Sequence, residues 1–154
     1  MNHFATRITA GLVGIAASVA LVAPAFAGSA TGSGTGALTA HGSGTAQVSG
    51  DVDAMGISGA GVLVVVDNGG DAKVVIHGKG KVSVSGHTRT YVGFNGSAAI
   101  TGNNVTVRLA GVNVNVAAKG HGSFSLKGHG TYDTKPGVTG GEGTWSSTGT
   151  TGSL

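Results

Sequence analysis

The fold of this protein follows from a pattern that first occurs as Ala40-His-Gly-Ser-Gly-Thr-Ala-Gln-Val-Ser-Gly-Asp51. The pattern recurs as Ile76-His-Gly-Lys-Gly-Lys-Val-Ser-Val-Ser-Gly-His87 and as Ala118-Lys-Gly-His-Gly-Ser-Phe-Ser-Leu-Lys-Gly-His129. In each copy, small or apolar residues alternate with polar ones. This period of two is typical of a β-strand with one packed face and one solvated face.

The alternation extends well beyond the repeats. Even-numbered residues between 34 and 52 are small or apolar, and the same parity returns from Val112 to Tyr132. Such stretches exceed the usual strand length of about 3–10 residues. Because the Gly-x-Gly pairs permit bending and close approach of backbones, we predict long strands bent at these glycines. The parity changes at Ala110-Gly111, which predicts a turn or a bulge.

The sequence therefore predicts an all-β fold, a sandwich or small barrel of long, bent, mostly antiparallel strands. The alternative is a repeat-derived β-solenoid in which the three repeats stack as coils. The apolar run Val62-Leu-Val-Val-Val66 is typical of a central strand that is covered on both faces. The segment Asp67-Asn-Gly-Gly-Asp71 predicts a tight turn, which would join this run to residues 73–86 as a hairpin.

The chain divides into three parts by composition. Residues 1–27 contain a short basic start, an apolar run and the small-residue sequence Ala25-Phe-Ala27, so they predict a secretory signal peptide cleaved after Ala27. Residues 28–133 form the predicted glycine-rich all-β domain. Residues 134–154 are rich in Gly, Ser and Thr, with a lone Trp145, and predict a flexible tail. The expected location is secreted or at the cell surface.

Composition excludes several function classes. The chain has 154 residues, of which 31 are Gly and none is Cys, so it has neither a disulfide framework nor a catalytic thiol. Its few charges are dispersed, unlike the clustered basic residues of a nucleic-acid surface. The mature chain has no predicted membrane span. Gly-x-Ser-x-Gly, phosphate-loop and paired-acid motifs are missing, so we predict no enzyme and no cofactor.

The histidines of the repeats suggest one candidate site. Aligning the three repeats places Asp51, His87 and His129 at the same final position. If the repeats paired in register, two histidines and one carboxylate would suit Zn²⁺ or non-haem Fe²⁺. Antiparallel pairing would separate them, and a histidine beside glycine is also an ordinary residue of a solvated strand face. We therefore predict no metal site.

A calcium site has similarly weak support. Asp67, Asn68 and Asp71 carry oxygen ligands of the kind that Ca²⁺ prefers. Their spacing matches neither an EF-hand loop nor the nonapeptide repeat of calcium-binding β-rolls. We predict that these residues form a turn.

Two function classes remain. The first is a secreted, non-catalytic structural or surface-interaction protein whose partners are other copies of itself or cell-surface components. The second is an extracellular glycan- or metal-binding module that uses the strand face rich in His, Lys, Ser and Thr. Among the aromatic residues, Phe94 and Phe124 are predicted to belong to the core.

Overall fold

The computed structural model describes residues 36–137 and 140–154, so the predicted signal peptide lies outside the described residues. The strands are β1 (Gly36–Asp67), β2 (Lys73–Ser85), β3 (Thr88–Asp133), β4 (Glu142–Thr144) and β5 (Thr150–Ser153). The described residues include no helix, and hence none long and apolar enough to cross a membrane.

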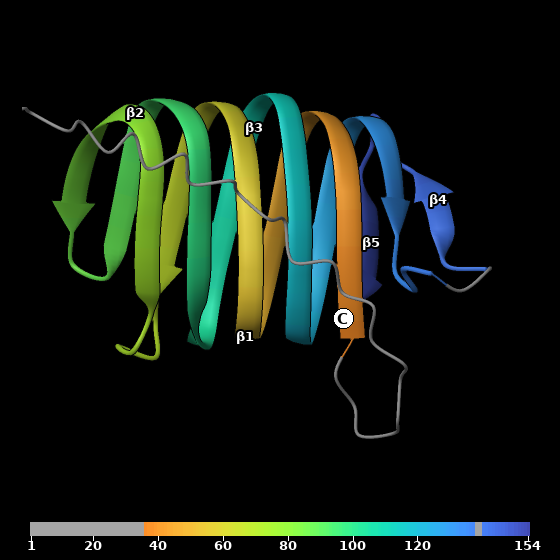
Figure 1. Ribbon diagram of the computed structural model, residues 1–154, viewed down its shortest axis with the longest axis horizontal. Coiled ribbons are helices and arrows are strands. Elements are labelled where there is room, and N and C mark those ends of the chain that lie inside the picture. Colours follow the sequence, from red (N-terminus) through yellow and green to blue (C-terminus); the bar gives the residue numbers. More distant parts are fainter. Residues whose placement is uncertain (1–35, 138–139) are drawn as a thin grey trace, which may run out of the picture.

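Most of the structure is one long β-hairpin wound into a spiral (Figure 1). One arm is β1 followed by β2, the other arm is β3, and Gly86-His87 forms the tip. Pairing between the arms runs from Ser85–Thr88 near the tip to Thr39–Asp133 at the base. The arms are antiparallel, as the alternation predicts for strands joined by a short turn.

The turns of the spiral are also paired with one another. Val48, for example, pairs with Phe124 on one side and with Val107 on the other, which lie 17 positions apart in β3. One turn of the spiral therefore takes about 17 residues, or roughly 56 Å of extended chain. Because each turn is paired with the next, β1 and the interior of β3 have neighbours on both sides.

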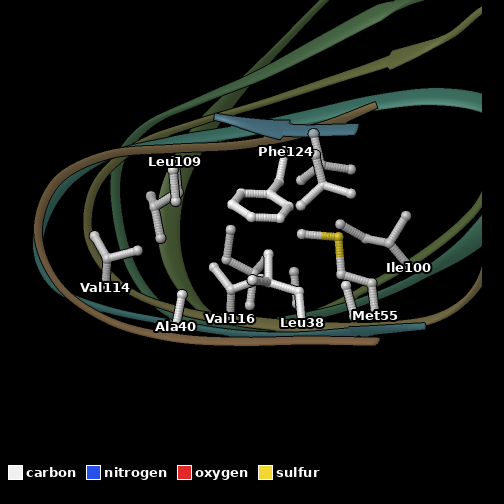
Figure 2. Packing of buried hydrophobic residues seen from close by; sticks show 14 of the residues in the cluster. Leu38, Ala40, Met55, Ile100, Leu109, Val114, Val116 and Phe124 are labelled. Atoms are coloured by element: carbon white, nitrogen blue, oxygen red, sulfur yellow. The ribbon is translucent and has the colours of Figure 1, made fainter. Parts of the chain in front are cut away.

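The spiral is flattened, and its two layers enclose the core (Figure 2). The core is built mainly from Val, Leu, Ile and Ala, with Met55, Phe94, Phe124 and Trp145 as its largest side chains. The prediction of an all-β structure with long, bent, antiparallel strands is confirmed. The sheet coils without closing into a barrel, so a two-layered sandwich describes the packing.

The predicted face of the strands is confirmed as well. Leu38 and Val48 of the first even-numbered stretch are buried, as are Val116 and Leu126 of the last. The parity change near Ala110-Gly111 is a bulge in β3, since Gly44 pairs with Gly111 whereas Gly42 pairs with Val114. Nearby Asn113 has a positive φ of 52°. Both Phe94 and Phe124 lie in the core, as predicted.

The predicted hairpin between residues 62–66 and 73–86 is wrong. Val65 pairs with Arg89 and Val107 of β3, and β2 pairs with the beginning of β3 instead. Residues 68–72 are a loop within the first arm, where one turn of the spiral passes into the next. The apolar run is also covered on one face only, because Leu63 and Val65 are buried whereas Val62 is exposed.

Glycines of the repeats face one another across paired strands. The first and third repeats are antiparallel neighbours, which places Gly42 opposite Gly130, Gly44 opposite Gly128 and Gly50 opposite Gly122. A Cβ atom on Gly50 would collide with the carbonyl oxygen of His121, and one on Gly122 would collide with that of Ser49. The repeated glycines therefore permit a close approach of backbones that no other residue allows.

Residues 134–154 were predicted to be a flexible tail, but their described part belongs to the sheet. β4 pairs with residues 131–133 of β3, and β5 pairs with residues 123–126. Between them, Trp145 is buried and its Nε1–H donates a 3.1 Å hydrogen bond to the carbonyl of Thr131. This segment covers the edge of β3 that has no further turn of the spiral beside it.

The glycine pairs generate a test of the packing. Gly50→Ala should destabilise the protein by about 2 kcal/mol or more, because the new methyl group collides with the facing backbone and φ is +139°. Gly56→Ala is the control, since its Cβ would meet nothing within 4 Å and φ is not restrictive. That change should stabilise the protein by about 0.4–1 kcal/mol. Urea unfolding measures the free energy of unfolding of both variants. Equal effects of the two substitutions would contradict the close backbone contact at Gly50.

The burial of Trp145 generates a second test. Trp145→Ala should lower the free energy of unfolding by roughly 3 kcal/mol, because it empties a buried site and removes a hydrogen bond. It should also speed cleavage after Glu142 of β4 by a glutamyl endopeptidase, because the C-terminal segment would leave the sheet. Trp145→Phe keeps most of the apolar contact, so its stability and cleavage rate should lie between those of the unmodified protein and Trp145→Ala. An unchanged cleavage rate in Trp145→Ala would show that this residue does not hold the segment on β3.

Candidate functional site

The outer face of one layer carries an open groove of about 1330 Å³. The groove crosses the strands, and the register shows the order in which it meets them. From one end to the other its lining comes from residues 73–77 of β2, 97–101 of β3, 54–58 of β1, 115–117 of β3, 39–41 of β1, 131–133 of β3 and 142–144 of β4. Segments far apart in the sequence thus form one continuous surface.

A line of polar residues runs along this groove, one from each strand segment. We call it the polar row, and it consists, in spatial order, of His77, Ser97, Ser58, Asn115, His41, Thr131 and Thr144. Directly paired residues project on the same face of a sheet. Since adjacent strands are about 4.8 Å apart, the row places one polar residue on each strand segment at that interval over roughly 29 Å.

A second line lies beside the polar row and forms most of the floor of the groove. We call it the small row, and it consists of Val75, Ala99, Gly56, Ala117, Thr39, Asp133 and Glu142. Its central residues have short side chains, and at Gly56 the space above the backbone is open. The middle of the groove is therefore shallow and mainly apolar, with polar groups along one side.

Hydrogen bonds fix the centre of the polar row. The amide nitrogen of Asn115 donates to the carbonyl of Asn113 over 3.0 Å, which directs its Oδ1 toward His41. The Nδ1–H of His41 therefore donates to that oxygen, at 2.5 Å. Nε2 of a neutral His41 is then left as an acceptor. Further along the row, the buried hydroxyl of Ser97 has no hydrogen-bond partner within the described structure.

Charged groups are confined to the two ends of the groove. Lys73 lies at the β2 end, and Asp133 and Glu142 lie at the β4 end. The backbone N–H groups of Glu142 itself and of Gly140 hold the pKa of the Glu142 carboxyl below its ordinary value. The carboxylate of Asp133 accepts the N–H of Lys135 over 2.7 Å. Both acids thus support the local turn, and the lining between the two ends contains no Lys, Arg, Asp or Glu.

The structure does not assemble the metal-ligand column that an in-register alignment of the repeats would produce. Asp51 pairs with His121 and accepts the N–H of Asn104 over 2.9 Å, while His129 pairs with Ser43. His87 belongs to the hairpin tip, where its carbonyl accepts the N–H of Asp67. Within residues 36–137 and 140–154, no three His, Asp or Glu side chains form a group suited to a metal ion.

The histidines of the groove are separated too. His77 and His41 lie four strands apart in the polar row, or about 19 Å, which is too far for them to share an ion.

The acidic residues of the loop between β1 and β2 are engaged in hydrogen bonds. Asp67 accepts the N–H groups of Gly70 and Ala72, as an aspartate does when it stabilises a turn. Asp71 accepts both the backbone N–H and the side-chain amide of Asn103. The Asp71 bonds attach the loop to β3. The carboxylates of Asp67 and Asp71 thus stabilise the loop by accepting N–H groups.

The alternation in the sequence does not predict the polar row, because its members come from strand segments far apart in the chain. A signal for it is present in the sequence. His41 and Ser58 are 17 positions apart, Ser97 and Asn115 are 18 apart, and Asn115 and Thr131 are 16 apart. That spacing acquires meaning only once the length of a spiral turn is known. Comparisons with protein-family models, curated proteins and solved structures find no match to this chain.

The Asp71 contacts predict a pH dependence of the loop. The N–H groups of Asn103 hold the pKa of Asp71 below its ordinary value of 3.8. Ionised Asp71 therefore stabilises the folded loop above that value, and the contribution is lost as the pH falls through the lower folded value. We expect the hydrogen-exchange protection factor of the Asn103 amide to fall over that acidic range.

Asp71→Asn should lower the protection at neutral pH and remove the pH dependence. Asp53→Asn, at an exposed position of β1, is the matched control and should change neither. A protection factor that is independent of pH in the unmodified protein would contradict this account.

Proposed function

We propose that this is an exported, non-catalytic surface-interaction protein that binds an extended, hydroxyl-rich polymer of the glycan class along the groove. The observation that carries the proposal is the polar row, which repeats hydrogen-bonding groups at the strand spacing. A linear polymer offers its own groups at regular intervals, so one chain can contact many strands in succession. Export is supported by the signal-peptide pattern of residues 1–27.

The chemistry of the groove favours an uncharged ligand. Hydroxyl, amide and imidazole groups can both donate and accept hydrogen bonds, as sugar hydroxyls do. The apolar floor between them suits the C–H faces of sugar rings, and the short side chains of Ala99, Gly56 and Ala117 leave room for a ring to lie close to the backbone. A polyanion would instead call for basic residues along the whole groove, whereas Lys73 stands at one end.

The same surface gives little support to catalysis. Acid–base chemistry requires a titratable group within hydrogen-bond reach of another reacting group. The acids of the groove lie at its β4 end and accept backbone N–H groups, and His41 is hydrogen-bonded to an amide rather than to a carboxylate. This arrangement suits the holding of a ligand.

Binding can be tested by co-sedimentation of the mature chain, residues 28–154, with insoluble cellulose and chitin. Gly56→Val should reduce retention about tenfold or more, because its side chain would stand on the open floor of the groove. The variant should remain folded, since Gly56 has room for a side chain and valine favours strands.

Ser123→Val is the matched control. It places the same side chain on an exposed strand position that does not line the groove, and it should leave retention unchanged. Absence of retention on either polymer, or equal loss in the two variants, would refute the proposed function. His41→Ala should weaken binding without a loss of stability. This variant tests the contribution of the polar row to binding, whereas Gly56→Val tests that of the floor of the groove.

A further inference from the structure

The two ends of the spiral differ. At one end, β4, β5 and Trp145 cover β3, and Gly143 and Gly152 lie against the rings of Tyr132 and Phe124. At the other end, β2 pairs with β3 on one side and has no described strand on its other side (Figure 1). A strand of 13 residues with an unpaired edge is a template for further pairing.

The open end also leaves apolar side chains uncovered on the inward face. Val82 pairs with Tyr91, which in turn pairs with buried Leu63, and Val84 pairs with Arg89, which in turn pairs with buried Val65. Paired residues share a face, so both valines point toward the interior of the spiral. They are nevertheless 58% and 64% exposed, because no further turn covers them.

We propose that β2 is a dimerisation edge, at which a second copy of this chain continues the spiral through antiparallel β2–β2 pairing. A two-fold axis through Lys79 gives the register with complete overlap of the two strands. In that register Val74 lies opposite Val84 of the second copy, Ile76 opposite Val82, and Gly78 opposite Gly80. Each exposed valine thus meets a partly buried apolar residue that already packs on the core.

Two features of the fold support this occupant. All strand pairs of the spiral are antiparallel, and the two-fold arrangement preserves that pattern where a translated copy would not. Glycine opposite glycine is also the pairing that recurs inside the molecule, for example at Gly78 and Gly96. Residues 28–35, Gly-Ser-Ala-Thr-Gly-Ser-Gly-Thr, contain no large apolar side chain that would cover the valines in their place.

Lysines on the outward face of β2 limit the association. The same register places Lys79 opposite its own copy. Like charges directly opposite each other are unfavourable, and salt screens them. The dimer should therefore become several-fold tighter between about 0.05 and 0.5 M salt, which is the reverse of an interface held by opposite charges.

Sedimentation velocity of the mature chain tests the proposal. A monomer–dimer equilibrium with this salt dependence is expected at concentrations up to about 100 µM. The double variant Val82→Lys/Val84→Lys should be monomeric and should keep the unfolding midpoint of the monomer, because both side chains are exposed there. Val112→Lys is the matched control, at a valine that is 53% exposed on β3, and it should dimerise normally.

Cysteine cross-linking tests the register in a chain that has no cysteine of its own. Directly opposed residues of an antiparallel pair are close enough for a disulfide. Lys79→Cys should therefore form a covalent dimer on mild oxidation. Lys73→Cys should not, whereas Lys73→Cys/Ser85→Cys should. A protein that stays monomeric, or a Lys79→Cys variant that does not cross-link, would overturn the proposal.

Discussion

The structure depends on the close, two-sided pairing of a single β-ribbon with itself. Each turn of the ribbon is hydrogen-bonded to the next, so a residue such as Val48 has paired neighbours on both sides. Where the backbones come closest, this arrangement requires the glycines of the repeats, because a Cβ atom at Gly50 or Gly122 would collide with the facing carbonyl group. The repeated pattern therefore specifies contact between strands rather than a site.

This construction explains how a chain with few large side chains forms a core. Glycine-rich strands lose more conformational entropy on folding than others, and Val, Ala and Leu offer modest burial in return. The spiral offsets this by satisfying backbone groups along nearly the whole ribbon and by enclosing one continuous core between two layers. The C-terminal segment completes it, since Trp145 supplies the largest side chain to that core.

The same winding creates the surfaces that we connect with function. A turn of about 17 residues brings one residue from every strand into line, so that residues from Thr39 to Thr144 share a groove. It also creates two unlike ends. The end at β3 is covered by the chain itself, whereas the end at β2 displays an unpaired edge and inward-facing valines. A surface for an extended ligand and an edge for a second copy thus arise from one topology.

The sequence by itself determined the strand type and which side chains face inward, because alternation is local and survives any choice of partner. It therefore predicted the burial of Leu38, Val116 and Phe124 and the bulge near Gly111. Only the tertiary structure decided which strands pair, since register depends on the length of a turn and not on neighbouring residues. For that reason the hairpin predicted around residues 67–71 is wrong, and the sequence did not predict the polar row. Long-range pairing also docked Trp145 on β3, although the composition of residues 134–154 is typical of a tail.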